Sequence, residues 1–322
     1  MQYVSLGKTG TKVSRICLGT MSFGNESEWM LELDQARPIF EKARDLGINF
    51  FDTANVYSGG RSEEILGELA KGSRNDLVIA TKVYGEASKD VNGHGLSRRH
   101  IMQQIRASLA RLQTDRVDLY QTHRWDYTTP IEETLGALGD IVHDEEAVYI
   151  GASSMFAWQF AKSLYTSDKL GLPRFVTMQD QYNLCYREEE REMIPLCKDQ
   201  GVGLIPWSPL ARGFLSGKYR RGEKPDTPRS RGDKLLEERF FREEDFDVLE
   251  AVEALAKEKA VSPSQVALSW LFHKDSVTAP IIGATKISHV EEAVAALDLK
   301  LSKEDMQRIE EPYRVRAISG HS

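Results

Sequence analysis

The chain has 322 residues, of which 41% are hydrophobic and 28% are charged, an ordinary composition for a globular protein with a large core. Its formal net charge of −7 argues against nucleic acid as the main partner. No run approaches about 18 consecutive apolar residues, so no membrane span is predicted. The N-terminal MQYVSLGKTGTKVS lacks the apolar core of a signal peptide, and we therefore expect a cytoplasmic protein. The three cysteines lack CxxC spacing, which favours buried free thiols, and no metal site is predicted.

Short runs rich in Val, Ile, Phe and Tyr alternate with amphipathic helical patterns along the whole chain. This alternation predicts parallel strands joined by helical crossovers. Eight strands, each followed by a helix, favour an α/β fold of the (β/α)₈ TIM-barrel type over an open doubly wound sheet, and we expect one domain spanning residues 1–322. The predicted strands are Ile16–Thr20, Asn49–Ala54, Leu77–Lys82, Val117–His123, Val148–Ser153, Phe175–Gln181, Gly203–Ser208 and Ala279–Gly283.

Capping sequences and glycines mark the predicted helix boundaries. The segments 129–132 (TPIE) and 262–265 (SPSQ) are typical of capping boxes with proline in the first helical position, and 288–291 (SHVE) predicts a third. Gly47 and Gly201 directly follow helical patterns, where a left-handed residue ends a helix.

Three segments lie outside the repeat. Tyr3–Ser14 is typical of a β-hairpin that plugs the bottom of the barrel. The polar segment Ser216–Asp245 is too long for an ordinary connection, which predicts a lid or binding loop. Glu311–Ser322 predicts an extended C-terminal tail over one face.

Four titratable residues come from three consecutive predicted strands and the loops after them. Asp52 ends the second strand and Tyr57 follows in its loop, Lys82 ends the third strand, and His123 ends the fourth. Because the active sites of such barrels lie at the carboxyl ends of the strands, we expect these side chains to converge on one rim.

These side chains form a coherent proton-transfer unit. A tyrosine has a pKa of about 10 in water, which is too high for efficient acid catalysis at neutral pH. An ammonium from Lys82 favours the phenolate of Tyr57, and Asp52 would keep that ammonium charged and oriented. His123 would polarise a substrate carbonyl. The unit therefore suits protonation of a developing alkoxide while a hydride arrives from the other side.

Taken alone, each of these residues also has an ordinary structural interpretation. Asp52 would be a helix cap, Lys82 a solvated strand end or an ion-pair partner, Tyr57 half-buried surface, and His123 a core histidine. Their joint occurrence on consecutive strand ends favours the catalytic interpretation.

The segments DTANVYSGGRSEEILG, VIATK, DLYQTHRWD and GLIPWSPLARGFLSGKY resemble the signatures of the aldo-keto reductase family. The similarity extends from LGKTGTKVSRICLGTMSFG to PIIGATKISHVEEAVAAL. TPIEETL, YIGASSM and YREEEREM carry a closer likeness to the bacterial branch of 1-deoxyxylulose-5-phosphate synthase and general aldo/keto reductase type. The resemblance implies a tetrad of Asp52, Tyr57, Lys82 and His123, extended binding of NADPH, and hydride transfer to an aldehyde or ketone.

The resemblance also assigns cofactor residues. It implies that Ser153, Ser154 and Gln179 hold the nicotinamide carboxamide and that Trp207 stacks on the nicotinamide ring. The implied pyrophosphate segment contributes Ser208, Leu210, Arg212, Gly213 and Lys218, and the adenosine end contributes Gly283, Thr285, Lys286 and Glu292. The Rossmann G-x-G-x-x-G fingerprint is absent from the sequence. We expect NADPH to be preferred over NADH, mainly because of Lys286.

The predicted substrate pocket is aromatic, with Trp29, Tyr84 and Trp125 as its walls. Such walls suit a small-molecule carbonyl, either an aryl or medium-chain aldehyde, and they also stack on sugar faces. Arg124, Arg229 and Arg231 would be able to hold a phosphate, although solvated surface is their ordinary reading. Two other functions stay open, a nucleotide-sensing subunit like the β-subunits of potassium channels and an enzyme that converts a sugar phosphate without net redox chemistry. The oligomeric state is not predicted.

Overall fold

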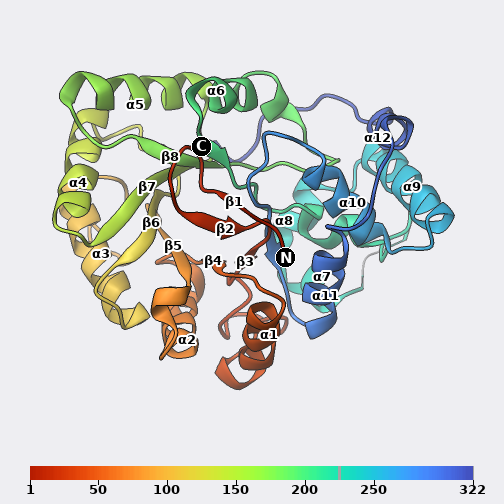
Figure 1. Ribbon diagram of the computed structural model, residues 1–322, viewed down its shortest axis with the longest axis horizontal. Coiled ribbons are helices and arrows are strands. Elements are labelled where there is room, and N and C mark those ends of the chain that lie inside the picture. Colours follow the sequence, from red (N-terminus) through yellow and green to blue (C-terminus); the bar gives the residue numbers. More distant parts are fainter. Residues whose placement is uncertain (224–225, 322) are drawn as a thin grey trace.

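A computed structural model describes residues 1–223 and 226–321 of the chain. Eight parallel strands follow one another around a sheet whose order is β10-β3-β4-β5-β6-β7-β8-β9 (Figure 1). Parallel bridges from Leu204 to Val277 and from Trp207 to Ile281 join the two ends of the sheet. The predicted (β/α)₈ TIM-barrel fold is therefore confirmed. The strands are β3 (Cys17–Gly19), β4 (Phe50–Asp52), β5 (Val78–Val83), β6 (Val117–Thr122), β7 (Ala147–Ser153), β8 (Phe175–Gln179), β9 (Gly203–Leu204) and β10 (Ile281–Gly283).

A helix follows each strand and packs outside the barrel, as Figure 1 shows. These helices are α1 (Leu33–Asp45), α2 (Arg61–Ala70), α3 (Arg98–Leu112), α4 (Ile131–His143), α5 (Ala157–Leu170), α6 (Met193–Gln200), α10 (Pro263–Phe272) and α11 (Ile287–Ala295). Four further helices are α7 (Pro228–Gly232), α8 (Lys234–Arg239), α9 (Glu243–Glu258) and α12 (Lys303–Glu310). None of the helices in the described residues is both long enough and apolar enough to cross a membrane.

The N-terminal hairpin closes one end of the barrel. Its strands β1 (Tyr3–Ser5) and β2 (Lys12–Ser14) pair antiparallel. Leu6 and Val13 are fully buried in a small core that also contains Cys17 and Phe50 from the barrel strands. The predicted plug is confirmed.

Two of the predicted strands, β9 and β10, are shortened where the chain contains a proline. β9 ends at Leu204 instead of Ser208, and β10 begins at Ile281 instead of Ala279. Pro206 and Pro280 lack the N–H that a ladder bond needs. Their carbonyls still accept from neighbouring strands, since Ile281 N donates to Pro206 O over 2.8 Å.

One of the three predicted capping boxes is present. Ser262 caps α10 together with Gln265, as expected. The box at 129–132 is wrong because the Thr129 hydroxyl donates to Asp126 instead, and Pro130 precedes α4 without a side-chain cap. The box at Ser288 is also wrong, since α11 begins at Ile287 and Lys286 is the residue before it. Gly47 and Gly201 have the left-handed backbone that was predicted.

The segment after β9 is more ordered than the predicted loop. Within Ser216–Asp245, α7 and α8 form and α9 begins, whereas residues 224–225 lie outside the described residues. Leu236 and Phe240, one helical turn apart, are buried and anchor α8 in the core.

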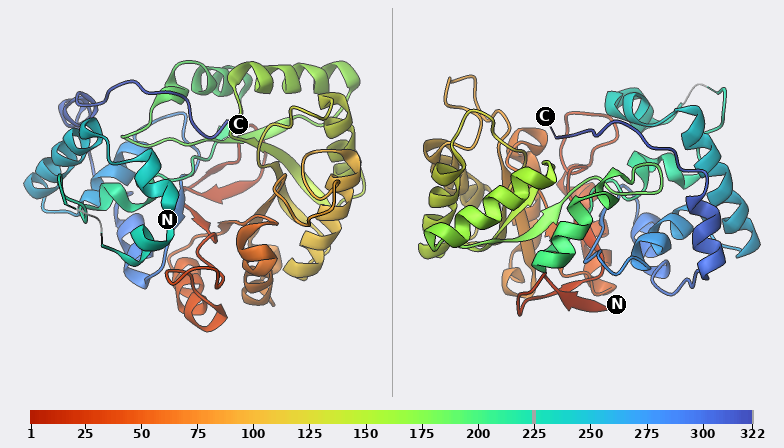
Figure 2. Two further views of the ribbon diagram at one scale, coloured as in Figure 1. Left: turned by 180° about the vertical axis from the view of Figure 1, so that it is seen from behind. Right: turned by 90° about the horizontal axis from the view of Figure 1, so that it is seen from above.

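The C-terminal tail crosses the end of the barrel opposite the hairpin (Figure 2, right). Residues 311–321 form no strand or helix beyond a turn at the start, as predicted, and Ser322 lies outside the described residues. Arg316 pairs with Asp245, and Ser319 N donates to the Tyr186 hydroxyl over 3.2 Å. These contacts hold the tail over the carboxyl ends of the strands.

Candidate active site

Three neighbouring strands turn polar side chains into the barrel interior. In the strand register, Asp52 lies beside Ala80 and Lys82 lies beside Gln121. The side chains of Lys82 and Asp52 are 0% and 3% exposed. A buried charge is costly unless it is paired, so these two side chains need partners of opposite charge.

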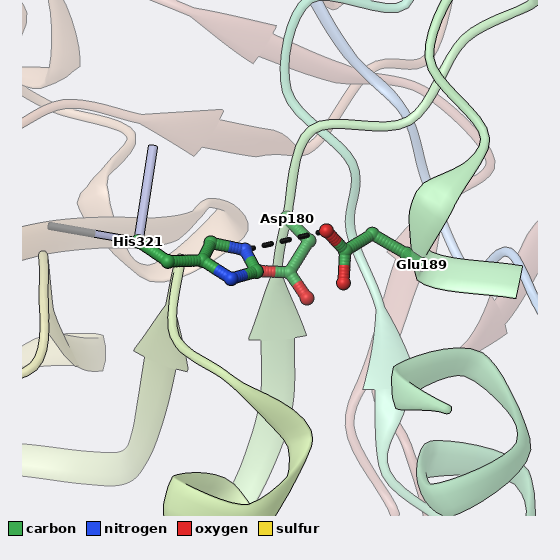
Figure 3. A group of neighbouring side chains, drawn as sticks. All are labelled: Asp180, Glu189 and His321. Atoms are coloured by element: carbon green, nitrogen blue, oxygen red, sulfur yellow. Dashed lines mark ion pairs between the residues drawn. The ribbon is translucent and has the colours of Figure 1, made fainter. Parts of the chain in front are cut away.

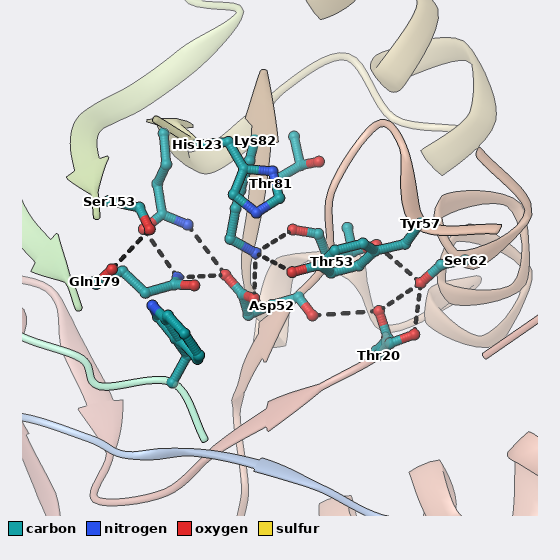
Figure 4. A network of polar contacts seen from close by, with 12 residues as sticks. Thr20, Asp52, Thr53, Tyr57, Ser62, Thr81, Lys82, His123, Ser153 and Gln179 are labelled. Atoms are coloured by element: carbon teal, nitrogen blue, oxygen red, sulfur yellow. Dashed lines mark hydrogen bonds and ion pairs between the residues drawn. The ribbon is translucent and has the colours of Figure 1, made fainter. Parts of the chain in front are cut away.

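Lys82 connects two of the predicted catalytic residues directly (Figure 4). Its ammonium donates to Asp52 Oδ2 over 2.5 Å and to the Thr53 carbonyl over 2.7 Å. Its third contact reaches the Tyr57 hydroxyl at 3.3 Å. Burial lowers the pKa of Lys82, but the charges of Asp52 and Tyr57 outweigh burial and hold that pKa above its ordinary value. The ammonium is therefore charged at neutral pH.

A strained turn brings Tyr57 to this position. Tyr57 begins a short 3₁₀ segment (Tyr57–Gly60) in which Ser58 has φ of 48° and Gly59 has φ of 58°. Left-handed backbone at a serine costs free energy and persists only where its surroundings impose it. After the turn, the buried Ser62 hydroxyl lies 2.8 Å from Thr20 Oγ1 and 3.0 Å from Thr53 Oγ1. These contacts tie the start of α2 to the residues that follow β3 and β4.

His123 faces the same phenol from the end of β6. Its ring is edge-on to Tyr57, with centroids 5.8 Å apart and an interplanar angle of 78°. Burial, and then the charges of Lys82 and Arg124, hold the pKa of His123 well below its ordinary value. The imidazole is therefore neutral at neutral pH, and one ring nitrogen carries a proton that it can donate to a carbonyl oxygen.

Two glutamines complete the surroundings of Asp52. Gln121 and Gln179 each donate to Asp52 Oδ1, over 3.0 and 2.9 Å, and Gln179 also donates to Gln121 Oε1 over 3.2 Å. Ser153 donates to the Gln179 carbonyl over 2.6 Å. The sequence interpretation assigned no role to Gln121, although its position two residues before His123 places it on the inner face of β6.

Trp207 and Ser154 lie beside this network. The indole N–H donates to Ser154 Oγ over 3.0 Å, and Ser154 N donates to Asp180 Oδ1 over 2.9 Å. Asp180 was not among the predicted site residues. Its burial, followed by the charge of Glu189, raises its pKa well above the ordinary range.

The predicted pyrophosphate segment contains several residues with left-handed backbone, and its arginine is paired with a carboxylate. Ser208, Ala211, Arg212 and Gly213 all have positive φ, between 48° and 93°. Arg212 forms a two-pronged ion pair with Asp233, through nitrogen–oxygen distances of 2.7 and 2.8 Å. Leu210 is half-buried, and Lys218 is exposed.

Several residues predicted to bind the adenosine end interact with His289. Thr285 N donates to His289 Nδ1 over 3.3 Å. Burial lowers the pKa of His289, and Lys218 and Lys286 lower it further while Glu292 raises it. The charges of Lys218 and Lys286 thus both act on this ring, from two different segments. Gly283 and Lys286 are exposed, and Glu292 accepts from the Ser262 hydroxyl over 3.4 Å.

The three predicted pocket aromatics occupy different environments. Trp29 lies beneath α7, with the Arg229 guanidinium 4.8 Å from its ring centroid. Tyr84 is half-buried, and burial followed by the charge of Asp126 raises its pKa. Trp125 is 8% exposed and belongs to the core. Its indole packs against Trp158, with ring centroids 6.0 Å apart.

Comparison with known proteins relates the chain to one family. The model of the aldo/keto reductase family matches residues 15–314. The aldo-keto reductase dtxS3 of Metarhizium robertsii is 40% identical, over 100% of this chain and 94% of the relative. The versiconal hemiacetal acetate reductase of Aspergillus parasiticus is also 40% identical, over 99% of this chain and 98% of the relative. Both relatives are fungal, so the closer likeness to the bacterial branch stays a prediction.

Proposed function

Because the chain belongs to the aldo/keto reductase family and is an oxidoreductase, we propose that it reduces an aldehyde or ketone to the alcohol with NADPH, with Tyr57 as the general acid. The observation that carries this proposal is the position of the Lys82 ammonium, which contacts both Asp52 Oδ2 and the Tyr57 hydroxyl. We also propose that one barrel domain, residues 1–322, carries the activity and that the protein is cytoplasmic.

The proton step follows from these contacts. When bound, the nicotinamide supplies a hydride to the carbonyl carbon. The electron pair of the C=O π bond moves to oxygen, and the Tyr57 O–H bond breaks as its proton is transferred to that oxygen. The phenolate left on Tyr57 is stabilised by Lys82, whose ammonium is held by Asp52. The neutral His123 donates its N–H to the same carbonyl oxygen and orients it.

The residues beside the tetrad fit a dinucleotide. Ser154 and Gln179 offer hydroxyl and amide groups to a carboxamide, and the half-buried Trp207 offers an aromatic face to its ring. Consecutive left-handed residues at 211–213 favour backbone N–H groups that converge on an anion. The pyrophosphate would compete with Asp233 for Arg212, because the carboxylate already occupies the guanidinium.

The sugar-phosphate alternative has less support from the charged groups near the site. Two of the three arginines that would hold a substrate phosphate are paired with carboxylates. Arg229 pairs with Asp233, and Arg231 pairs with Asp226 and Glu28. A nucleotide-sensing subunit would have the same tetrad as a reductase. Turnover is therefore the property that distinguishes these two functions.

The test is steady-state oxidation of NADPH with a panel of aryl and medium-chain aldehydes, in parallel with Tyr57→Phe. We expect turnover by the wild type, equimolar alcohol product, and loss of turnover in the variant. Tight NADPH binding without turnover on any aldehyde would favour the sensing function. Conversion of a sugar phosphate without added nicotinamide cofactor would favour the third function. Either result would contradict the proposal.

A further inference from the structure

Two ionisable side chains from the segment after β8 meet a third from the C-terminal tail at the mouth of the barrel (Figure 3). Asp180 follows β8, Glu189 lies in the 3₁₀ helix Glu188–Glu190, and His321 comes from the C-terminal tail. The three residues are 0%, 4% and 6% exposed. One oxygen of each carboxylate and one ring nitrogen lie within 4.8 Å of one another.

The hydrogen bonds within the cluster leave two polar atoms unsatisfied. His321 Nε2 lies 3.2 Å from Glu189 Oε1, which also accepts from the Tyr186 hydroxyl over 3.2 Å. Ser154 N donates to Asp180 Oδ1 over 2.9 Å. Asp180 Oδ2 and His321 Nδ1 are buried, and neither has a hydrogen-bond partner among the described residues. Because a buried polar atom without a partner is unfavourable, a ligand that bound these two atoms would be stabilised there.

The cluster also contains more acidic than basic groups. Two carboxylates face one imidazole, so ionisation of both carboxylates would leave negative charge that the imidazole alone cannot neutralise. No lysine or arginine of the described residues forms an ion pair with Asp180 or Glu189. Ionisation of both buried carboxylates without an ion-pair partner of this kind is unfavourable. A divalent cation would stabilise the ionised carboxylates and would accept the free lone pairs.

We propose that Asp180, Glu189 and His321 bind one divalent cation of the zinc class. Two carboxylate oxygens and one imidazole nitrogen form a donor set that such cations accept, and three protein ligands leave a coordination position for water. The site does not depend on the proposed reductase function.

The cation would fasten the tail across the mouth of the barrel. His321 directly follows Gly320, where a Cβ atom would lie 3.5 Å from Trp207 Cζ2. Asp180 directly follows Gln179 in the chain. Metal bound between Asp180 and His321 would therefore fix the end of the tail beside the indole and beside the interior network around Asp52.

The test is a metal titration of the full-length protein after treatment with a chelator. Binding of Co²⁺ is measured by visible absorption, and binding of Zn²⁺ is measured by calorimetry. The variants are His321→Gln and, as the matched control, His143→Gln, an exposed histidine at the end of α4. Because His321 lies in the tail and outside both hydrophobic cores, its substitution leaves the barrel core intact. Asp180→Asn tests a second ligand.

We expect the wild type and His143→Gln to bind one equivalent of metal with the same affinity. The apparent affinity should fall at least about tenfold in His321→Gln and in Asp180→Asn, because each variant removes a ligand from the site. Zinc should also raise the Tm of the wild type and of His143→Gln but not that of His321→Gln. Identical titrations of the wild type and His321→Gln would overturn the proposal. If no metal binds and the tail nevertheless stays packed at this site, the proposal would be overturned as well.

Discussion

The Lys82 ammonium donates to Asp52 Oδ2 over 2.5 Å, and both side chains are almost completely buried. The remaining donors of the ammonium reach the Thr53 carbonyl at 2.7 Å and the Tyr57 hydroxyl at 3.3 Å. The contact with the phenol is the longest of the three. Because this contact shortens and strengthens as negative charge develops on Tyr57, its stabilisation is greater in the transition state than in the ground state.

Lys82→Met should abolish most turnover and should also destabilise the fold. Asp52 would then be a buried carboxylate without its counter-ion, which costs about 3–5 kcal/mol. Adding Asp52→Asn removes that uncompensated charge and should recover part of the free energy of unfolding without recovering kcat. Urea unfolding and steady-state kinetics on the single and double variants measure the two effects. Wild-type stability of Lys82→Met would show that the pair contributes little.

Tyr57→Phe should leave NADPH binding intact and lower kcat by about 10²-fold or more, because the ring stays and the proton donor is lost. Cofactor binding is measured by calorimetry and kcat with a saturating aldehyde. A variant that kept a kcat near that of the wild type would remove Tyr57 from the role of general acid.

The eight strands and the convergence of the tetrad were predictable because strand ends are local features of a sequence and a barrel brings them to one rim. The shortening of β9 and β10 could also be predicted, because Pro206 and Pro280 are present in the sequence. The helix α8 was not predicted, since a polar segment is typical of a loop and its burial of Leu236 depends on packing. The meeting of His321 with Asp180 was not predictable from spacing either, because it depends on the path that the tail takes over the barrel.

Lowering the pH should destabilise the protein partly through His123. The folded chain holds the pKa of His123 well below its ordinary value, whereas the unfolded chain takes up a proton near pH 6.5. The contribution of His123 is therefore complete above about pH 6.5. It is lost as pH falls through the folded pKa, by up to about 1.4 kcal/mol per pH unit. Urea unfolding at pH 7.5, 6.5 and 5.5 should show a steeper decline for the wild type than for His123→Gln. Parallel declines would contradict this assignment.

Trp207→Ala should weaken cofactor binding by roughly 0.5–1.5 kcal/mol from lost stacking, and by more from lost area. Trp207→Phe separates the ring from its N–H, which donates to Ser154 Oγ. The phenylalanine variant should keep most of the affinity because it keeps an aromatic face. Calorimetry is the suitable measurement, since it does not depend on indole fluorescence. A dissociation constant that stayed unchanged in Trp207→Ala would place the nicotinamide elsewhere.

NADPH should bind more tightly than NADH, and Lys286 should account for much of the difference. The two cofactors differ only in the 2′-phosphate, so selectivity depends on groups at the adenosine end. Lys286 is exposed and directly precedes α11, where the helix N-terminus favours an anion. The charge of Lys218 acts on the same His289 ring, so Lys218 should share the phosphate.

A hydrogen bond to a charged group contributes about 1.5–3 kcal/mol, or roughly 10- to 150-fold in affinity. Lysine is a point charge that cannot hold phosphate with two parallel bonds as arginine does, and an exposed ammonium is screened by salt. The preference should therefore lie at the low end of this range and decrease as ionic strength rises. Lys286→Ala should weaken NADPH several-fold and leave NADH nearly unchanged. Lys300→Ala, an exposed lysine before α12, should change neither. Calorimetric titration of both cofactors at low and high salt measures each effect, and wild-type protein that bound NADH as tightly as NADPH at low salt would refute the assignment.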